Sequence, residues 1–244
     1  MQVSLLSHTP QPDLLVALSA RRCYSSLSIS DLEENFDDSE IDRLLGILRS
    51  RNHLSPFEHA NFTFSVMGIS RALSHQLVRH RMASYSQESQ RFVEYLNLPS
   101  LPFVIPPTIE NVPHAKKIFL ETMKKMLETY RELRSVGVPG EDARYIFPNS
   151  LETKLVFSMN ARSLFNFFEQ RCCQKAQWEI RKLANYMLSR CKAVSPRIFQ
   201  TAGAPCGYSE RPYCRENDQA CSRFPPHLRE RIEVQSDERS TEKA

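Results

Sequence analysis

No apolar run in this 244-residue chain approaches the ~20 residues that a membrane-spanning helix requires. Residues 1–6 lack both the basic segment and the long apolar core of a secretory signal. The net charge of +4 is also small, whereas a domain that binds nucleic acid in bulk is strongly basic. We therefore expect a cytoplasmic protein with no membrane and no nucleic-acid partner.

Cysteine is scarce in the first 170 residues, where Cys23 stands alone; the other six of the seven follow residue 170. Their uneven spacing in a protein expected to be cytosolic does not indicate a disulfide framework. Four of them are candidate ligands of zinc or of an iron–sulfur cluster: Cys172, Cys206, Cys214 and Cys221. The C-x2-C pair that would make this assignment strong is missing, so reduced cysteines in a small folded extension, or disulfides, remain as alternatives.

The pattern of apolar residues predicts both strands and long helices. Strands are expected at 3–6, 61–66 and 153–159, and helices at 12–18, 41–48, 70–77, 112–136 and 161–194. This mixture lacks regular βαβ alternation, which indicates the α+β class: mixed helices and a small sheet in a single domain. We assign that domain to residues 1–200, a cysteine-bearing C-terminal extension to 201–235 and a flexible tail to 236–244.

Residues 79–91 carry the strongest chemical signal. The triplet Arg79-His80-Arg81 is followed by four hydroxyl side chains, the last of them Ser89, and then by Arg91. Guanidinium groups bind phosphate oxygens in pairs, so this density of arginine favours an anionic, phosphate-bearing ligand. The alternative is a solvated basic helix end.

Two weaker clusters flank this run in the sequence. The turn 53–59 packs two histidines and a carboxylate around Pro56, but its His-x5-His spacing is not that of a metal site. A ligand-facing or capping role is the better interpretation of these histidines. Arg144 lies just after Glu141, and a surface ion pair between them would explain it without any ligand.

The segment 160–171 has a polar stripe on a predicted helix. Arg162, Asn166 and Gln170 recur at i, i+4 and i+8, with Asn160 just before the helix. Amides donate and accept hydrogen bonds, which suits them to read the edge of a heterocycle. The apolar face of the same helix is expected to pack in the core through Leu164, Phe165, Phe167 and Phe168.

These segments, in this order, closely resemble the flavin-dependent thymidylate synthases. The family signature Arg-His-Arg, seven residues, then Ser, occurs here at 79–89, with Arg91 in the expected place. Four further segments also match: the histidine-Pro-Phe-Glu-His turn at 53–59, Ala-Arg-Tyr at 143–145, the Asn-Ala-Arg-Ser-Leu-x-Asn-Phe helix at 160–167 and Ala-Gln-Trp-Glu-Ile at 176–180. The resemblance covers roughly residues 1 to 200.

The resemblance implies an enzyme that methylates dUMP reductively to dTMP. Methylenetetrahydrofolate would donate the carbon, and FAD reduced by NADPH would supply the hydride. It implies a homotetramer with shared active sites, in which Arg144 and Arg171 meet residues 76–91 of a neighbouring chain. The better-known thymidylate synthases activate uracil with a cysteine thiolate, and no cysteine lies near the arginine run in the sequence.

The resemblance also implies a set of site residues. The residues expected to bind FAD are His53, Ser55, Arg79, His80, Arg81, Asn160, Arg162 and Asn166. Those expected to bind dUMP are Gln76, Gln87, Ser89, Gln90, Arg91, Arg144 and Arg171. The two candidates for a catalytic role are Arg171 and Ser89. Arg171 would stabilise the charge that develops on the pyrimidine carbonyls. For Ser89 we favour a role in binding the phosphate or the pyrimidine over a role as nucleophile.

Two positions depart from the family pattern: Lys175 stands where many members have histidine, and Gln87 where they often have an acidic residue. These departures and the extension motivate one alternative, a flavoprotein of the same fold acting on a different or modified pyrimidine nucleotide. A second alternative is a non-catalytic nucleotide-binding protein, because the arginines lack an evident acid–base pair.

Overall fold

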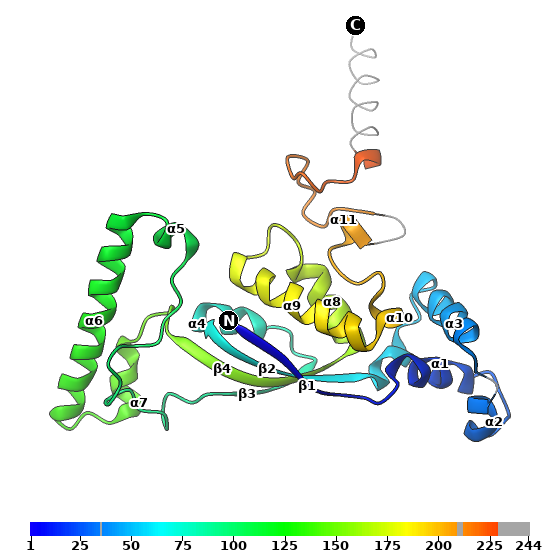
Figure 1. Ribbon diagram of the computed structural model, residues 1–244, viewed down its shortest axis with the longest axis horizontal. Helices are drawn as coiled ribbons and strands as arrows, with labels where there is room; N and C mark the ends of the chain where they lie inside the picture. Colours follow the sequence, from blue (N-terminus) through cyan, green and yellow to red (C-terminus); the bar gives the residue numbers. More distant parts are fainter. Residues whose placement is uncertain (35, 209–211, 229–244) are drawn as a thin grey trace, which may run out of the picture. The chain divides into compact units, whose positions relative to one another are not determined.

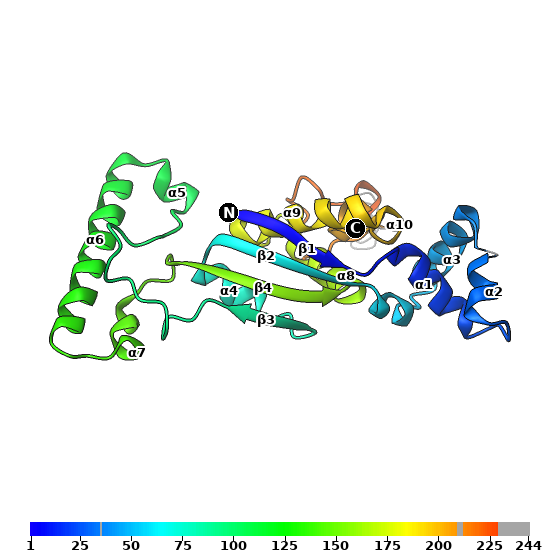
Figure 2. The ribbon, with the colours of Figure 1, turned by 60° about the horizontal axis from the view of Figure 1, so that its bottom comes forward.

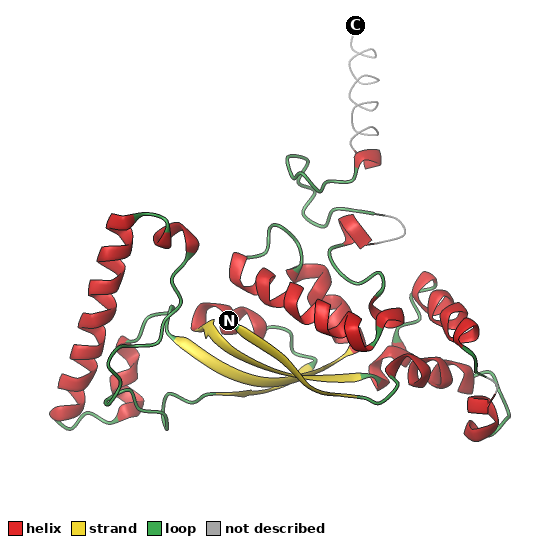
Figure 3. Cartoon of the chain, in the orientation of Figure 1, coloured by secondary structure: helices red, strands yellow, loops and turns green. Residues whose placement is uncertain are grey.

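The computed structural model describes residues 1–34, 36–208 and 212–228 (Figure 1). The chain forms two compact units: unit 1 contains residues 1–4 and 64–157, and unit 2 contains 5–63 and the chain from 158 onward. Helices and a small sheet are mixed along the chain, which confirms the α+β class (Figure 3). The expected flexible tail, 236–244, lies outside the described residues.

The sheet has four strands in the order β1-β2-β4-β3 (Figure 2). Their bounds are β1 Gln2–His8, β2 Asn61–Ser70, β4 Glu152–Asn160 and β3 Ala83–Gln87. β1, β2 and β4 confirm the three predicted strands and extend them. β3 was not predicted, because its five residues lie inside the arginine run, where the chemistry of the side chains masked a short polar–apolar alternation.

One glycine is required by a close approach between strands. Gly68 in β2 has φ of 67°, a backbone conformation that costs other residues free energy. A Cβ atom at this position would lie 3.0 Å from the backbone nitrogen of Met1. Both facts exclude a larger side chain here, and they explain why β1 can begin beside this part of β2.

Unit 1 holds the helices α4 Arg71–Leu77, α5 Pro107–Glu110, α6 Pro113–Ser135 and α7 Gly140–Ala143, and the 3-10 turn η2 Arg144–Ile146. The hydroxyl of Ser70 accepts a hydrogen bond from the Leu73 amide at 3.0 Å, so Ser70 caps α4 as predicted. The long helix predicted at 112–136 is confirmed as α6. It ends before Gly137, whose φ of 91° fits a glycine just past a helix.

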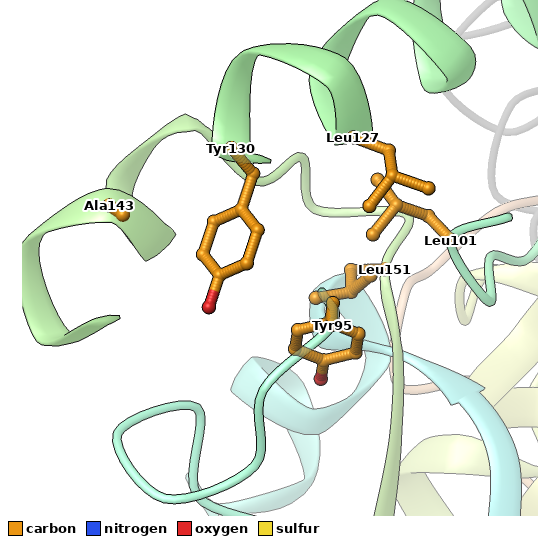
Figure 4. Packing of buried hydrophobic residues seen from close by; sticks show 6 residues of the cluster. All are labelled: Tyr95, Leu101, Leu127, Tyr130, Ala143 and Leu151. Atoms are coloured by element: carbon orange, nitrogen blue, oxygen red, sulfur yellow. The ribbon is translucent and has the colours of Figure 1, made fainter. Parts of the chain in front are cut away.

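A hydrophobic cluster in unit 1 fixes the position of α7. Its buried members are Tyr95, Leu101, Leu127, Tyr130, Ala143 and Leu151. Figure 4 shows Leu127 and Tyr130 projecting from α6 toward Tyr95 and Leu151. The Tyr130 ring also packs on Phe147, with centroids 4.7 Å apart. Because Ala143 is part of this core, the backbone of the next residue, Arg144, is held in a fixed position.

Unit 2 holds the helices α1 Pro12–Arg22, α2 Ile29–Glu34, α3 Asp38–Ser50, α8 Ala161–Arg171, α9 Trp178–Val194, α10 Pro196–Phe199 and α11 Pro205–Tyr208, and the 3-10 helix η1 Ser55–His59. The predicted helical region 161–194 is thus two neighbouring helices, α8 and α9, joined by a turn at 172–177 (Figure 1). Leu164, Phe167 and Phe168 are fully buried, which confirms the predicted apolar face of α8; Phe165 is half-buried.

Candidate functional site

The predicted site residues fall into two clusters, one in each unit. The arginine cluster, in unit 1, comprises Gln76, Arg79, His80, Arg81, Gln87, Ser89, Gln90, Arg91 and Arg144. The amide cluster, in unit 2, comprises His53, Ser55, Asn160, Arg162, Asn166 and Arg171.

Tyr85 of β3 holds the backbone of the Arg-His-Arg triplet. The single proton of its hydroxyl is shared between the carbonyls of Leu77, at 2.8 Å, and of His80, at 2.9 Å. Its ring stacks on Phe157, with centroids 5.7 Å apart. Burial raises the pKa of Tyr85, so the hydroxyl keeps the proton that it donates. The side chains of Arg79 and Arg81 remain exposed and available to a ligand.

Gln87 joins three elements of unit 1. Its amide nitrogen donates to the hydroxyls of Ser74 in α4 and Thr153 in β4, each at 3.1 Å. Both hydroxyl residues are 1% exposed, so these bonds lie in a protected interior. The two donors of the Gln87 amide are therefore committed, and only its carbonyl oxygen is left for the ligand contact that we expected. A carboxylate at this position has no amide donors and could only accept hydrogen bonds.

Arg91 and Arg144 meet at Glu141. The Nε atom of Arg91 donates to the Glu141 carboxylate at 2.9 Å, and the Nε atom of Arg144 donates to the Glu141 backbone carbonyl, also at 2.9 Å. Within its own chain, Arg144 therefore lies beside Arg91, while its expected contact with residues 76–91 of a neighbouring chain stays a prediction. The core around Ala143 is the physical reason for this placement.

Ser89 shapes the turn that presents Arg91. Its hydroxyl oxygen accepts the Arg91 amide hydrogen at 3.2 Å, a local side-chain turn of the kind serine favours. Among the described residues, no histidine or lysine forms a hydrogen bond with this hydroxyl. Its own proton can therefore go to a ligand oxygen, while no base is in place to activate it as a nucleophile.

Arg71 is a candidate that the sequence analysis missed. Its Nη2 atom donates to the Glu88 carbonyl at 2.8 Å, but its buried Nε atom has no hydrogen-bond partner among the described residues. Burial lowers the pKa of Arg71, and the like charge of Arg144 acts in the same direction. Unpartnered buried donors are rare and costly, so this guanidinium suits an incoming acceptor. No sequence pattern marked it, because it reads as an ordinary first-turn residue of α4.

The amide cluster is built on α8. Asn160 caps this helix through a bond from the Ser163 amide to its side-chain oxygen at 2.8 Å. The Gln170 amide donates to the Asn166 side-chain oxygen at 2.9 Å, so the predicted polar stripe is confirmed for these two residues. The remaining amide donors of Asn160 and Asn166 are left for a ligand.

The turn at 53–59 packs against the same helix. Glu58 of η1 forms an ion pair with Arg162, and Phe57 contacts the ring of Phe165 edge-on, with centroids 5.2 Å apart. The structure thus brings together two segments that the resemblance assigned to one cofactor. His53 and Ser55 are both exposed.

A cavity of about 500 Å³ opens between the end of α3, α8 and the C-terminal extension. Leu54, Phe165 and Ala202 supply apolar lining, and Arg49 and Glu169 supply charge. Its volume and mixed lining are those of a small-molecule site.

Arg171 lies in a second cavity, of about 220 Å³, whose opposite wall is the extension. The hydroxyl of Tyr213 donates to Glu169 at 2.6 Å, and Arg215 pairs with the same carboxylate at 2.9 Å. Burial lowers the pKa of Arg171 from its ordinary value, and the group remains a cation at neutral pH.

Lys175, which stands in place of a histidine, is tied to the same extension. Its ammonium pairs with Asp218 at 2.9 Å, and that bond raises the pKa of Lys175 and lowers the pKa of Asp218.

The later cysteines do not form a preassembled metal centre. Among residues 1–34, 36–208 and 212–228, no three His, Cys, Asp or Glu side chains come close enough together to bind one ion. Cys172, one of our four candidates, is only 3% exposed, and burial raises the pKa of its thiol to about 12. Its neighbour Cys173 lines the Arg171 cavity instead, with Cys206 and Cys214. In the part of the chain that is described, no helix is both long and apolar enough to cross a membrane.

Comparison with known proteins gives consistent matches. Residues 4–197 match the family model described as thymidylate synthase complementing protein. The flavin-dependent thymidylate synthase of Geobacter sulfurreducens is 48% identical over 206 residues, covering 84% of this chain and 88% of that protein. The enzyme of that name from Clostridium tetani is 41% identical over 239 residues, covering 91% and 94%. A match over 91% of this chain must extend past residue 200 into the extension.

Proposed function

The chain belongs to the thymidylate synthase complementing protein family, and from that membership we propose that it catalyses the reductive methylation of dUMP to dTMP. Methylenetetrahydrofolate donates the carbon, and NADPH is the source of reducing equivalents. The observation that carries this proposal is the family match over residues 4–197, which includes every residue of both clusters.

The arginine cluster is suited to the phosphate of dUMP. Arg91 and Arg144 are held side by side by Glu141, and the Arg91–Glu141 pair is about half exposed on both sides. Exposed ion pairs of this kind are weak, so a phosphate can replace the carboxylate at little cost. Ser89, Gln90 and Gln76 would bind the rest of the nucleotide and fix its orientation for reaction.

Arg171 is suited to the pyrimidine ring. Uracil carbon C5 becomes nucleophilic only when electron density is added at C6, and negative charge then develops on the ring carbonyls. The half-buried guanidinium of Arg171 would stabilise that charge more strongly than a solvated cation could, because its surroundings are less polar than water. We assign Arg171 this catalytic role and Ser89 a binding role.

The donor set fits FAD. The exposed guanidinium groups of Arg79 and Arg81, with His80 and Arg162, suit its pyrophosphate, and the amides of Asn160 and Asn166 suit the edge of a heterocycle. His53 and Ser55 complete the set. Reduced FAD, when bound, would supply the hydride that the better-known enzymes take from the folate, and these residues would bind and orient it.

We place this enzyme in the cytoplasm as a homotetramer with shared active sites. Three large apolar side chains beside the arginine cluster are strongly exposed: Met82 at 74%, Phe92 at 80% and Tyr145 at 83%. Large apolar side chains exposed to this degree are available to an interaction surface. Contact between copies of the chain would cover them.

Purified protein tests the catalytic proposal. We expect a yellow protein whose flavin absorption is bleached by NADPH and which forms dTMP from dUMP when methylenetetrahydrofolate is present. A yellow protein that is bleached but ignores dUMP would favour a different pyrimidine nucleotide. A colourless protein that binds dUMP would favour a binding module.

Mixing of inactive variants tests the shared sites. Arg91→Ala and Arg171→Ala disable different clusters, and co-expression should assemble tetramers in which roughly a quarter of the sites carry both native arginines. Recovery of activity in the mixed sample, absent from each variant alone, is the expected result. A mixed sample as inactive as its components would show that each site is built within one chain.

A further inference from the structure

Four cysteines of unit 2 line one small cavity of about 20 Å³. Cys173 comes from the turn that follows α8, and Cys206, Cys214 and Cys221 come from the C-terminal extension. We propose that these four thiols bind one zinc ion, which joins the extension to the α8–α9 turn. The zinc site stands on this cluster alone and does not depend on the proposed reaction.

Positive charge lies beside the four thiols. Each ligand must lose its proton to bind the ion, so positive charge nearby favours binding. Lys175 and Arg223 both line this cavity and supply that charge.

Two cations beside the thiols offset part of the charge of the bound ion. Zinc with four thiolates carries a net charge of about −2, which two cations can offset. Asp218, which already pairs with Lys175 at 2.9 Å, and Glu216 also line the cavity and reduce this offset.

The size of the cavity selects a single ion. A volume of about 20 Å³ is close to that of one water-sized probe. An iron–sulfur cluster, with several irons and sulfides, needs more room than this. Four thiolates in a tetrahedron with zinc–sulfur distances of about 2.3 Å are the standard structural zinc site. Since no three such ligands yet converge among the described residues, the thiols must turn inward as the ion binds.

Burial decides which cysteine of the pair at 172–173 is the ligand. Cys172 is 3% exposed and is not among the residues that line the cavity. Cys191 is fully buried in α9, and Cys23 lies at the end of α1, so neither can contribute. Cys173 is half-buried, with its thiol at the cavity. The ligand from the helix side is therefore Cys173 rather than Cys172.

The proposed ion would act on the active site by position alone. Zinc has no redox chemistry, and the site holds the turn that begins one residue after Arg171. Tyr213 and Arg215 of the extension bind Glu169 and line the cavity of Arg171. Zinc would stabilise this position of the extension.

Elemental analysis of the full-length protein tests the proposal. We expect about one zinc per chain in protein from zinc-supplemented cells, and little zinc in Cys173→Ser and Cys214→Ser. The matched controls Cys172→Ala and Cys23→Ser should keep their zinc. Protein that contains no zinc and takes none up on titration would overturn the proposal, as would zinc loss in Cys172→Ala with retention in Cys173→Ser. Iron with acid-labile sulfide in place of zinc would also overturn it.

A second measurement covers variants that fail to fold. Cobalt added to metal-free wild-type protein should produce the intense thiolate-to-cobalt absorption of a four-cysteine site. The band should weaken when any one ligand is replaced in a variant that circular dichroism shows to be folded. A cobalt spectrum without thiolate bands would exclude these sulfurs as ligands.

Discussion

Arg91 and Arg144 are bound to the same residue, Glu141, through its carboxylate and its backbone carbonyl, at 2.9 Å each. The carboxylate contact is exposed and exchangeable, while the backbone contact persists whatever the side chain does. Glu141 therefore acts as a placeholder for an anion at Arg91 and as a fixed support for Arg144.

Glu141→Gln tests this placeholder role. Removal of the competing charge should tighten dUMP binding by up to about fivefold, because exposed ion pairs contribute at most about 1 kcal/mol. The backbone support of Arg144 is unchanged. Isothermal titration calorimetry with dUMP measures the effect, with Arg91→Lys as the partner variant, which should weaken binding about tenfold or more. Weaker binding in Glu141→Gln would mean that the carboxylate aims Arg91 instead of competing for it.

Arg71→Lys tests the buried guanidinium. Lysine keeps the charge but loses the unpartnered Nε donor, so KM for dUMP should rise about tenfold while kcat stays within about twofold. Arg134 offers a matched control, because its Nε atom is also buried without a hydrogen-bond partner but its other nitrogens bind Glu94 and the Val138 carbonyl. Arg134→Lys should leave KM unchanged. Equal effects in both variants would indicate a structural role only.

The sequence predicted most of the long elements because their apolar periodicity is strong. β2, β4, α6 and the capping of α4 by Ser70 follow from local pattern alone. It could not predict β3, which is short and polar, or the pairing of Arg91 with Glu141, fifty residues away. Arg71 and the place of Cys173 among the four cysteines of the small cavity were missed for the same reason, since burial and neighbours across the fold are tertiary properties. The family motifs supplied site residues that periodicity could not.

Tyr85→Phe should loosen the Arg-His-Arg triplet. The variant keeps the stacking on Phe157 but loses the bonds to the carbonyls of Leu77 and His80, at a cost of about 1–2 kcal/mol in the free energy of unfolding. We expect weaker flavin retention, measured as the ratio of absorbance from flavin to absorbance from protein after gel filtration. Full flavin content with lowered stability would separate the tyrosine from the cofactor site.

Stability should fall at alkaline pH. Burial raises the pKa of Cys172 to about 12 and of Tyr95 to about 12, so these groups ionise in the unfolded chain before they do so in the folded protein. Their stabilising contribution is complete below their ordinary pKa values and is lost as pH rises from about 9 toward 12, by at most about 1.4 kcal/mol per pH unit for each group. Urea unfolding at several pH values measures it.

Cys172→Ala should flatten this decline, because alanine has no proton to lose. Cys23→Ser is the control, since Cys23 is exposed and its replacement should leave the slope unchanged. An identical slope in wild type and Cys172→Ala would show that Cys172 does not stay protonated in the folded protein.

The identity of the folate product tests the central claim most directly. If the hydride comes from FAD recharged by NADPH, methylenetetrahydrofolate gives up only its carbon, and oxygen-free reaction mixtures should contain tetrahydrofolate and dTMP in equal amounts, with an equal amount of NADPH consumed. Dihydrofolate as the product, with dTMP formed and no NADPH consumed, would mean that the folate itself is the reductant and would contradict the account.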